Sequence, residues 1–133
     1  MGRTRVLSVG QCSFDHSTIS RWISAKFEAD TVNAHTSAEA LVALRSGEFS
    51  LVLVNRVGDR DGASGLDLIR SIKADLVLAH LKVMLVSNFE TAQKQAVDLG
   101  AISGFGKGDI GTLAAETVVR EAIGSKKTTP ASV

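Results

Sequence analysis

The sequence predicts an α/β fold built on a five-stranded parallel sheet that is doubly wound, with helices on both faces. Two observations lead to this prediction. Five short apolar runs alternate with amphipathic segments, and the runs at residues 51–54 and 83–86 are apolar without interruption. Alternating strands and helices favour a parallel sheet, and continuous apolar runs are typical of strands that helices cover on both faces. The length of 133 residues fits a single domain.

Three strand–helix units are expected in the first half of the chain, with strands at residues 5–9, 31–34 and 51–54. Apolar side chains recur at helical spacing over residues 17–27, which predicts the first helix. Thr36 and Glu39 have the spacing of a capping box, and Gly47 would end the second helix. Ser64 is positioned to cap a third helix that runs to Lys73.

Two further units complete the pattern, with strands at residues 83–86 and 102–105 followed by helices at 91–99 and 112–123. The fifth strand contains Gly104, which weakens it. We expect the folded domain to span residues 4–124, and we expect residues 125–133 to form a polar C-terminal tail.

Composition limits the classes of function. The chain has 15 basic and 14 acidic residues, so no global positive field indicates a nucleic-acid partner. One cysteine rules out an intramolecular disulfide and a multi-cysteine metal site. No run approaches 18 apolar residues, and no signal peptide is visible, so we expect a cytoplasmic protein that does not bind membranes.

Ligands of doubly wound sheets bind outside the carboxyl ends of the strands, where the strand order reverses. The residues predicted at that edge are therefore the candidate site. They are Gly10 and Gln11 after the first strand, Asn55 after the third, Ser87 after the fourth and Lys107 after the fifth.

The segments around these positions resemble a response-regulator receiver domain, the phosphoacceptor module of two-component signalling. The similarity is carried by LVLVN at 51–55, GLDLIR at 65–70, residues 74–87, and Gly100-Ala101 followed by Lys107. It extends over residues 4–124 and implies the strand order 2-1-3-4-5.

The resemblance also implies a chemistry that this chain lacks the side chains to perform. Receivers use an aspartate after the third strand as nucleophile, and two acidic residues after the first strand help to hold Mg²⁺. Asn55, Gly10 and Gln11 stand at those positions here, whereas Ser87 and Lys107 keep the receiver residue types. We therefore expect a degenerate site with no catalytic residue, metal or cofactor. Replacing Asn55 by aspartate would give Lys107 an anionic partner, so the change would be neutral or favourable unless desolvation of the carboxylate cancels the attraction, and the net sign depends on burial.

Other carboxylates and the single thiol offer alternatives. Asp15 would act as a helix N-cap rather than a metal ligand, and Asp59 and Asp61 would be turn residues unless they restore some metal binding. Lys107 would bond the Asn55 carbonyl or pair with a loop aspartate. The competing functional class is a catalytic phosphotransfer protein that uses Cys12 or a repaired acidic site.

The resemblance suggests where a partner docks. Receivers bind partners, or a second copy, on the face formed by the fourth helix, fifth strand and fifth helix, here about residues 91–121. The usual aromatic switch aligns with Gly104, so we expect phosphorylation-independent binding to a signalling protein or a homodimer. Charges introduced at Gln95 and Ala115 are expected to weaken that contact and leave the fold intact.

Overall fold

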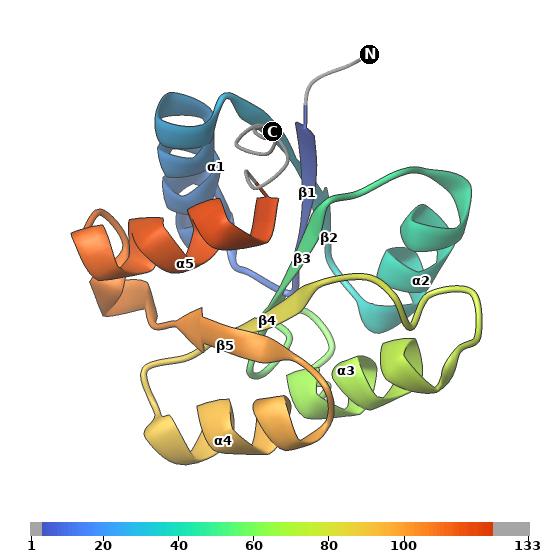
Figure 1. Ribbon diagram of the computed structural model, residues 1–133. Coiled ribbons are helices and arrows are strands. Elements are labelled where there is room, and N and C mark those ends of the chain that lie inside the picture. The colour runs from blue at the N-terminus through green and yellow to red at the C-terminus, as the bar shows by residue number, and fades with distance from the viewer. Residues whose placement is uncertain (1–3, 124–133) are drawn as a thin grey trace, which may run out of the picture.

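The computed structural model describes residues 4–123 (Figure 1). Five strands alternate with five α-helices, as the sequence predicts. In chain order the elements are β1 (Thr4–Val9), α1 (Ser13–Phe27), β2 (Ala29–Ala34), α2 (Ser37–Ser46), β3 (Leu51–Asn55), α3 (Gly65–Ala74), β4 (Val83–Val86), α4 (Glu90–Asp98), β5 (Ile102–Phe105), the 3-10 turn η1 (Lys107–Asp109) and α5 (Leu113–Ile123). The expected tail at 125–133 lies outside the described residues.

The strands form one parallel sheet in the order β2-β1-β3-β4-β5, which confirms the predicted topology. The register is regular from β2 to β4. Between β4 and β5 it shifts, because Met84 pairs with Ile102 and Val86 pairs with Phe105, so that β5 has one residue more than β4 over this stretch. The carboxyl ends of β1, β3, β4 and β5 therefore meet at one edge, which we call the carboxyl edge.

Two apolar clusters cover the two faces of the sheet. One joins β-strand side chains to α2, α3 and α4 and includes Leu68 and Ile72. The other packs β-strand side chains against α1 and α5 (Figure 1). In this second cluster the Trp22 ring makes an edge-on contact with Phe105, with ring centroids 5.4 Å apart. Residues 51–54 are at most 1% exposed, so burial on both faces explains their unbroken apolar run.

Several helix starts differ from the sequence predictions. α1 begins four residues earlier than expected, because the Cys12 sulfur accepts a hydrogen bond from the Asp15 amide at 3.4 Å and caps the helix. The hydroxyl of Thr36 accepts from the Glu39 amide at 3.1 Å, whereas the Glu39 carboxylate accepts from the His35 amide, so the expected capping box is only half formed. Ser64 is the N-cap of α3 by position, but its side chain makes no capping bond.

Candidate functional site

Three of the five candidate residues meet at the carboxyl edge. Asn55, Ser87 and Lys107 line an open hollow of about 270 Å³, together with Arg56, Val57, Val86, Asn88 and Phe89. Gly10 and Gln11 are not part of its lining, although the Gly10 carbonyl accepts a hydrogen bond from the Asn55 side chain.

The Asn55 side chain donates hydrogen bonds to two backbone carbonyl groups. Its amide nitrogen donates to the carbonyl oxygen of Gly10 at 3.0 Å and to that of Val57 at 2.7 Å. Both N–H groups of the carboxamide are thus used to hold two loops together. A carboxylate has no proton to donate, so an aspartate at this position would face two carbonyl oxygens.

The backbone of the β3–α3 loop occupies the space beside Gly10. Gly10 has a φ of +77°, and a Cβ added there would lie 3.1 Å from the Cα of Gly58. The Gly10 carbonyl also accepts from the Asp59 amide at 2.9 Å. A side chain at position 10 would therefore meet both backbone strain and a close neighbour. Of the two loop aspartates, Asp61 accepts from the Ala63 amide at 3.0 Å, as expected of a turn residue.

Gln11 is buried rather than turned towards the hollow. Its side chain is 2% exposed, and neither polar atom of its amide has a hydrogen-bond partner among the described residues. The sequence places Gln11 at the candidate site and does not predict this burial.

Lys107 has a carboxylate partner from α1. Its ammonium group lies 2.8 Å from a carboxylate oxygen of Asp15, and both side chains are partly buried. The hydrogen bond from Lys107 lowers the pKa of Asp15, burial opposes that shift, and a hydrogen bond from Cys12 adds to the lowering. Of the two partners expected for Lys107, the Asn55 carbonyl or one of the aspartates near this edge, the structure shows the second, and that aspartate is Asp15. The role expected of Asp15 was the helix cap. The cap prediction is wrong, because Cys12 caps the helix and leaves the Asp15 carboxylate free to bind Lys107.

Ser87 is buried at 7% exposure and serves the local backbone. Its hydroxyl accepts from the Phe89 amide at 3.1 Å, at the turn that leads into α4. This is the strand-end role in which short hydroxyl side chains satisfy nearby amides.

Comparison with known proteins identifies the fold of the chain. Neither a family model nor a curated protein sequence matches the chain. A putative response regulator from Chloroflexus aurantiacus J-10-fl superposes with a TM-score of 0.82 at 12% identity, covering 92% of this chain and 99% of that one. The chain has the fold of a response-regulator receiver domain.

Two further solved structures agree with this assignment of the receiver fold. A response regulator receiver protein from Pseudomonas putida has a TM-score of 0.73 at 24% identity, with 90% of this chain and 98% of that one covered. A response regulator from Thermotoga maritima has a TM-score of 0.75 at 21% identity, with 93% and 100% covered.

The receiver fold implies a Mg²⁺ site, but the residues present do not fit one. Mg²⁺ requires several oxygen ligands at short range, commonly carboxylates. Gly10 offers no side chain, Asn55 points its N–H groups at backbone carbonyls, and the Asp15 carboxylate is held by an ammonium group. Within residues 4–123, no three His, Cys, Asp or Glu side chains form a group that could hold a metal ion.

A glutamine that the sequence analysis did not single out joins α4 to the sheet. The Gln93 amide nitrogen donates to the carbonyls of Leu85 at 2.8 Å and Ser87 at 3.1 Å, and its oxygen accepts from the Gly104 amide at 3.0 Å. Gly104 is necessary at this point, because a Cβ there would overlap the Leu85 carbonyl. The signal available in the sequence was this strand glycine, which often marks a bulge or a close backbone approach.

The receiver's α4–β5–α5 face is partly apolar. We use this name for the exposed residues of the three elements, chiefly Lys94, Gln95, Val97, Ile102 and Leu113. Gln95 is exposed, as expected. The expectation that Ala115 lies at the surface is wrong. Ala115 is 2% exposed and packs in the apolar cluster between α5 and the sheet, so a charge introduced there would be buried in the core.

Among the described residues, no helix has the length and apolar character needed to cross a membrane.

Proposed function

We propose that this chain is a receiver-like signalling domain that acts through protein contact, without accepting a phosphoryl group and without Mg²⁺. The observation that carries the proposal is the pair of hydrogen bonds from Asn55 to the carbonyls of Gly10 and Val57. The position that holds the nucleophile in receivers is here a structural donor between two loops.

The chemistry of phosphoryl transfer supports the same conclusion. An acyl phosphate requires a carboxylate nucleophile, and the neutral carboxamide of Asn55 is not one. Lys107, the cation that would stabilise phosphoryl oxygens, has its charge balanced by Asp15 at 2.8 Å. An incoming phosphoryl group would have to break this ion pair and would meet the Asp15 carboxylate.

The competing proposal, a phosphotransfer enzyme that uses Cys12, has no observation in its favour. The Cys12 sulfur accepts a hydrogen bond from the Asp15 amide at 3.4 Å, and the adjacent Asp15 carboxylate would repel an approaching phosphate.

The balanced charge and the composition of the chain favour a cytoplasmic protein partner over a nucleic acid or a membrane.

We propose that the partner, another signalling protein, docks on the α4–β5–α5 face. Val97 and Leu113 are 44% and 76% exposed there, so apolar area is available for contact, while Ala96 and Val119 face the sheet and are fully buried. The three hydrogen bonds of Gln93 fix α4 against β4 and β5. Binding on a face fixed in this way does not depend on a phosphorylation switch.

The test combines amide NMR spectra with affinity capture. Spectra of the ¹⁵N-labelled chain are recorded before and after addition of acetyl phosphate and Mg²⁺, and cell extract is passed over the immobilised chain under both conditions. We expect unchanged amide shifts over residues 90–121 and the same retained partner. Leu113→Asp and Gln95→Arg should lose that partner, whereas Leu76→Asp, at an exposed leucine outside this face, should retain it. Phosphodonor-dependent shifts or retention would contradict the proposal.

A further inference from the structure

A rigid turn between α3 and β4 presents apolar side chains to solvent. Leu76 is 98% exposed and Val77 is 68% exposed. The Asp75 carboxylate accepts from the amides of Val77 at 2.8 Å and Leu78 at 3.3 Å, and these bonds lower its pKa. The Asp75 carboxylate also pairs with Arg45 of α2. The turn is thus held in one conformation with Leu76 pointing outward.

A second set of hydrogen bonds, donated by Lys73 of α3, holds the same turn. The Lys73 ammonium group donates to the carbonyls of Ala79 at 3.0 Å and Leu81 at 2.6 Å, and burial lowers the pKa of this lysine. A backbone that is already held loses little entropy when the turn is buried in a contact. Leu76 is therefore displayed at a fixed place on the surface, as an anchor residue would be.

A groove lies directly beside this turn, at the amino edge of the sheet, opposite the candidate site. It has a volume of about 980 Å³, and we call it the amino-edge groove. Its walls come from the start of β1, the end of α2, the α2–β3 connection and the α3–β4 turn. Polar and charged residues line it, among them Arg45, which pairs with Asp75, together with the apolar residues Leu44, Phe49, Val77, Leu78 and Leu81. An apolar projection and a recess with both apolar and polar walls thus lie on one face of the molecule.

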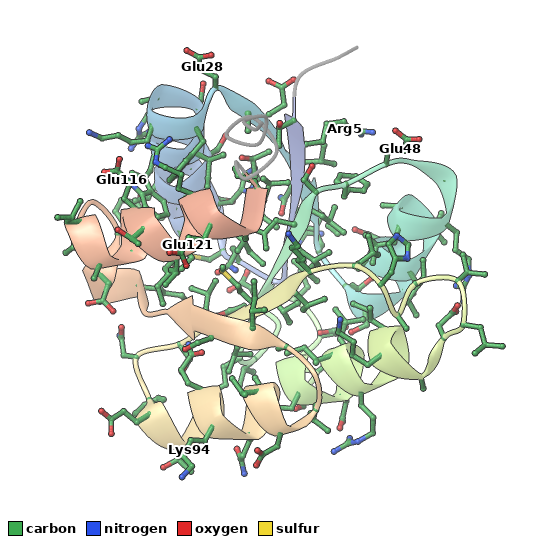
Figure 2. The ribbon with its side chains drawn as sticks, in the orientation of Figure 1. Arg5, Glu28, Glu48, Lys94, Glu116 and Glu121 are labelled. Carbon is green, nitrogen blue, oxygen red and sulfur yellow. The ribbon has the colours of Figure 1, made fainter. Side chains whose placement is uncertain are left out.

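Two opposite charges stand at this groove. Arg5 lies over the Phe49 ring, 4.5 Å from its centroid, and Glu48 is exposed one residue before that ring. Both side chains line the groove, and Figure 2 shows them projecting at the same end of the molecule. Neither makes an ion pair with another described residue.

We propose that two copies of this chain associate through this face around a two-fold axis. Leu76 of each copy enters the amino-edge groove of the other, and Arg5 of each copy faces Glu48 of the other. A two-fold interface uses one patch twice, so the patch must be complementary to itself, and a patch that carries both a projection and a recess, and both a cation and an anion, meets that condition. The net charge of +1 adds little repulsion between copies. This surface is separate from the α4–β5–α5 face, so the inference does not rest on the proposed function.

Sedimentation equilibrium of the full chain over a concentration series tests the inference. We expect a molar mass that approaches twice 14.0 kDa as concentration rises. Leu76→Asp should weaken self-association by about tenfold or more, because it places a charge in the recess of the second copy. Leu113→Asp, which alters an exposed leucine on the α4–β5–α5 face, should leave it unchanged.

A charge exchange tests the pairing itself. Glu48→Arg should weaken association by placing two cations opposite each other, and adding Arg5→Glu to that variant should restore it. Far-UV circular dichroism and thermal unfolding confirm that each variant is folded. A parent chain that remains monomeric up to about 1 mM, the weak end of specific association, overturns the inference. A dimer that survives Leu76→Asp, or one that Leu113→Asp dissociates, also overturns it.

Discussion

On the β1–β3 side of the carboxyl edge, backbone fills the space beside Gly10, and Asn55 holds the β3–α3 loop against the end of β1. On the β4–β5 side, Ser87 and Lys107 keep the side-chain types of an ordinary receiver. Their partners, however, are a local amide and a carboxylate from α1. Asn55, Ser87 and Lys107 thus all have partners within the chain, so a carboxylate introduced at position 10 or 55 would meet groups that are already bonded.

The largest effect is expected from Gly10→Asp. Its φ of +77° and the 3.1 Å approach to Gly58 should together cost about 3 kcal/mol or more in the free energy of unfolding. Gly62→Asp is the matched control, because its φ is +65° but nothing lies within 4 Å of an added Cβ. That variant should lose only about 1–2 kcal/mol. Urea unfolding measures both, and equal losses would mean that the packed loop is unimportant.

Asn55→Asp is expected to destabilise the chain by about 2 kcal/mol at pH 7, because two donors are lost and a carboxylate faces two carbonyls. The sequence left the sign of this change open, and the structure favours a loss, since Lys107 already has a partner in Asp15. The pKa of the new carboxyl should be raised by this environment, so the loss should shrink as the pH falls from 7 towards the unfolded pKa of about 3.9 and should change no further below it.

Asn88→Asp is the control for that change, because Asn88 uses its oxygen to accept from the Gly108 amide at 3.2 Å. A carboxylate can make the same bond, so stability should change by less than about 0.5 kcal/mol. An Asn55→Asp variant more stable than the parent would show that the β1–β3 side can still hold an acid.

Gln93→Ala tests what fixes α4 to the β4–β5 side. Removing three hydrogen bonds leaves the buried carbonyl of Leu85 and the amide of Gly104 short of partners, so we expect a loss of about 2 kcal/mol in urea unfolding. Amide hydrogen exchange in α4 should accelerate in parallel. Gln95→Ala, two residues along the same helix and exposed, should change neither quantity. Equal behaviour of the two variants would contradict a fixed α4.

Asp15→Asn should have the smallest effect, about 1 kcal/mol at pH 7. The pKa of Asp15 is lowered in the folded chain, so its stabilising contribution is complete above the unfolded value of about 3.9 and is lost as the pH falls further. Parent and variant should therefore converge near about pH 2 in urea unfolding. Asp67→Asn, which breaks the exposed pair with Arg70, should cost almost nothing at either pH.

The sheet could be predicted from the sequence because residues 51–54 and 83–86 are buried on both faces, and strands buried in this way have unbroken apolar sequences. The positions of Asn55, Ser87 and Lys107 followed from strand ends in the same way. Which aspartate pairs with Lys107 could not be predicted, because the sequence does not show that Cys12 caps α1 with its thiol. The role of Gln93 could not be predicted either, because it depends on the irregular pairing of β4 with β5. Ala115 was misplaced because a helix of small residues gives little contrast between its two faces.

The most direct test of the account is intact mass spectrometry of the chain after incubation with acetyl phosphate and Mg²⁺. A receiver domain with an intact phosphoacceptor aspartate, treated in parallel, serves as the positive control. The account predicts no added mass on this chain under conditions that fully modify the control. The addition of one phosphoryl group, located by peptide mapping at Asn55, Cys12 or a loop aspartate, would contradict it.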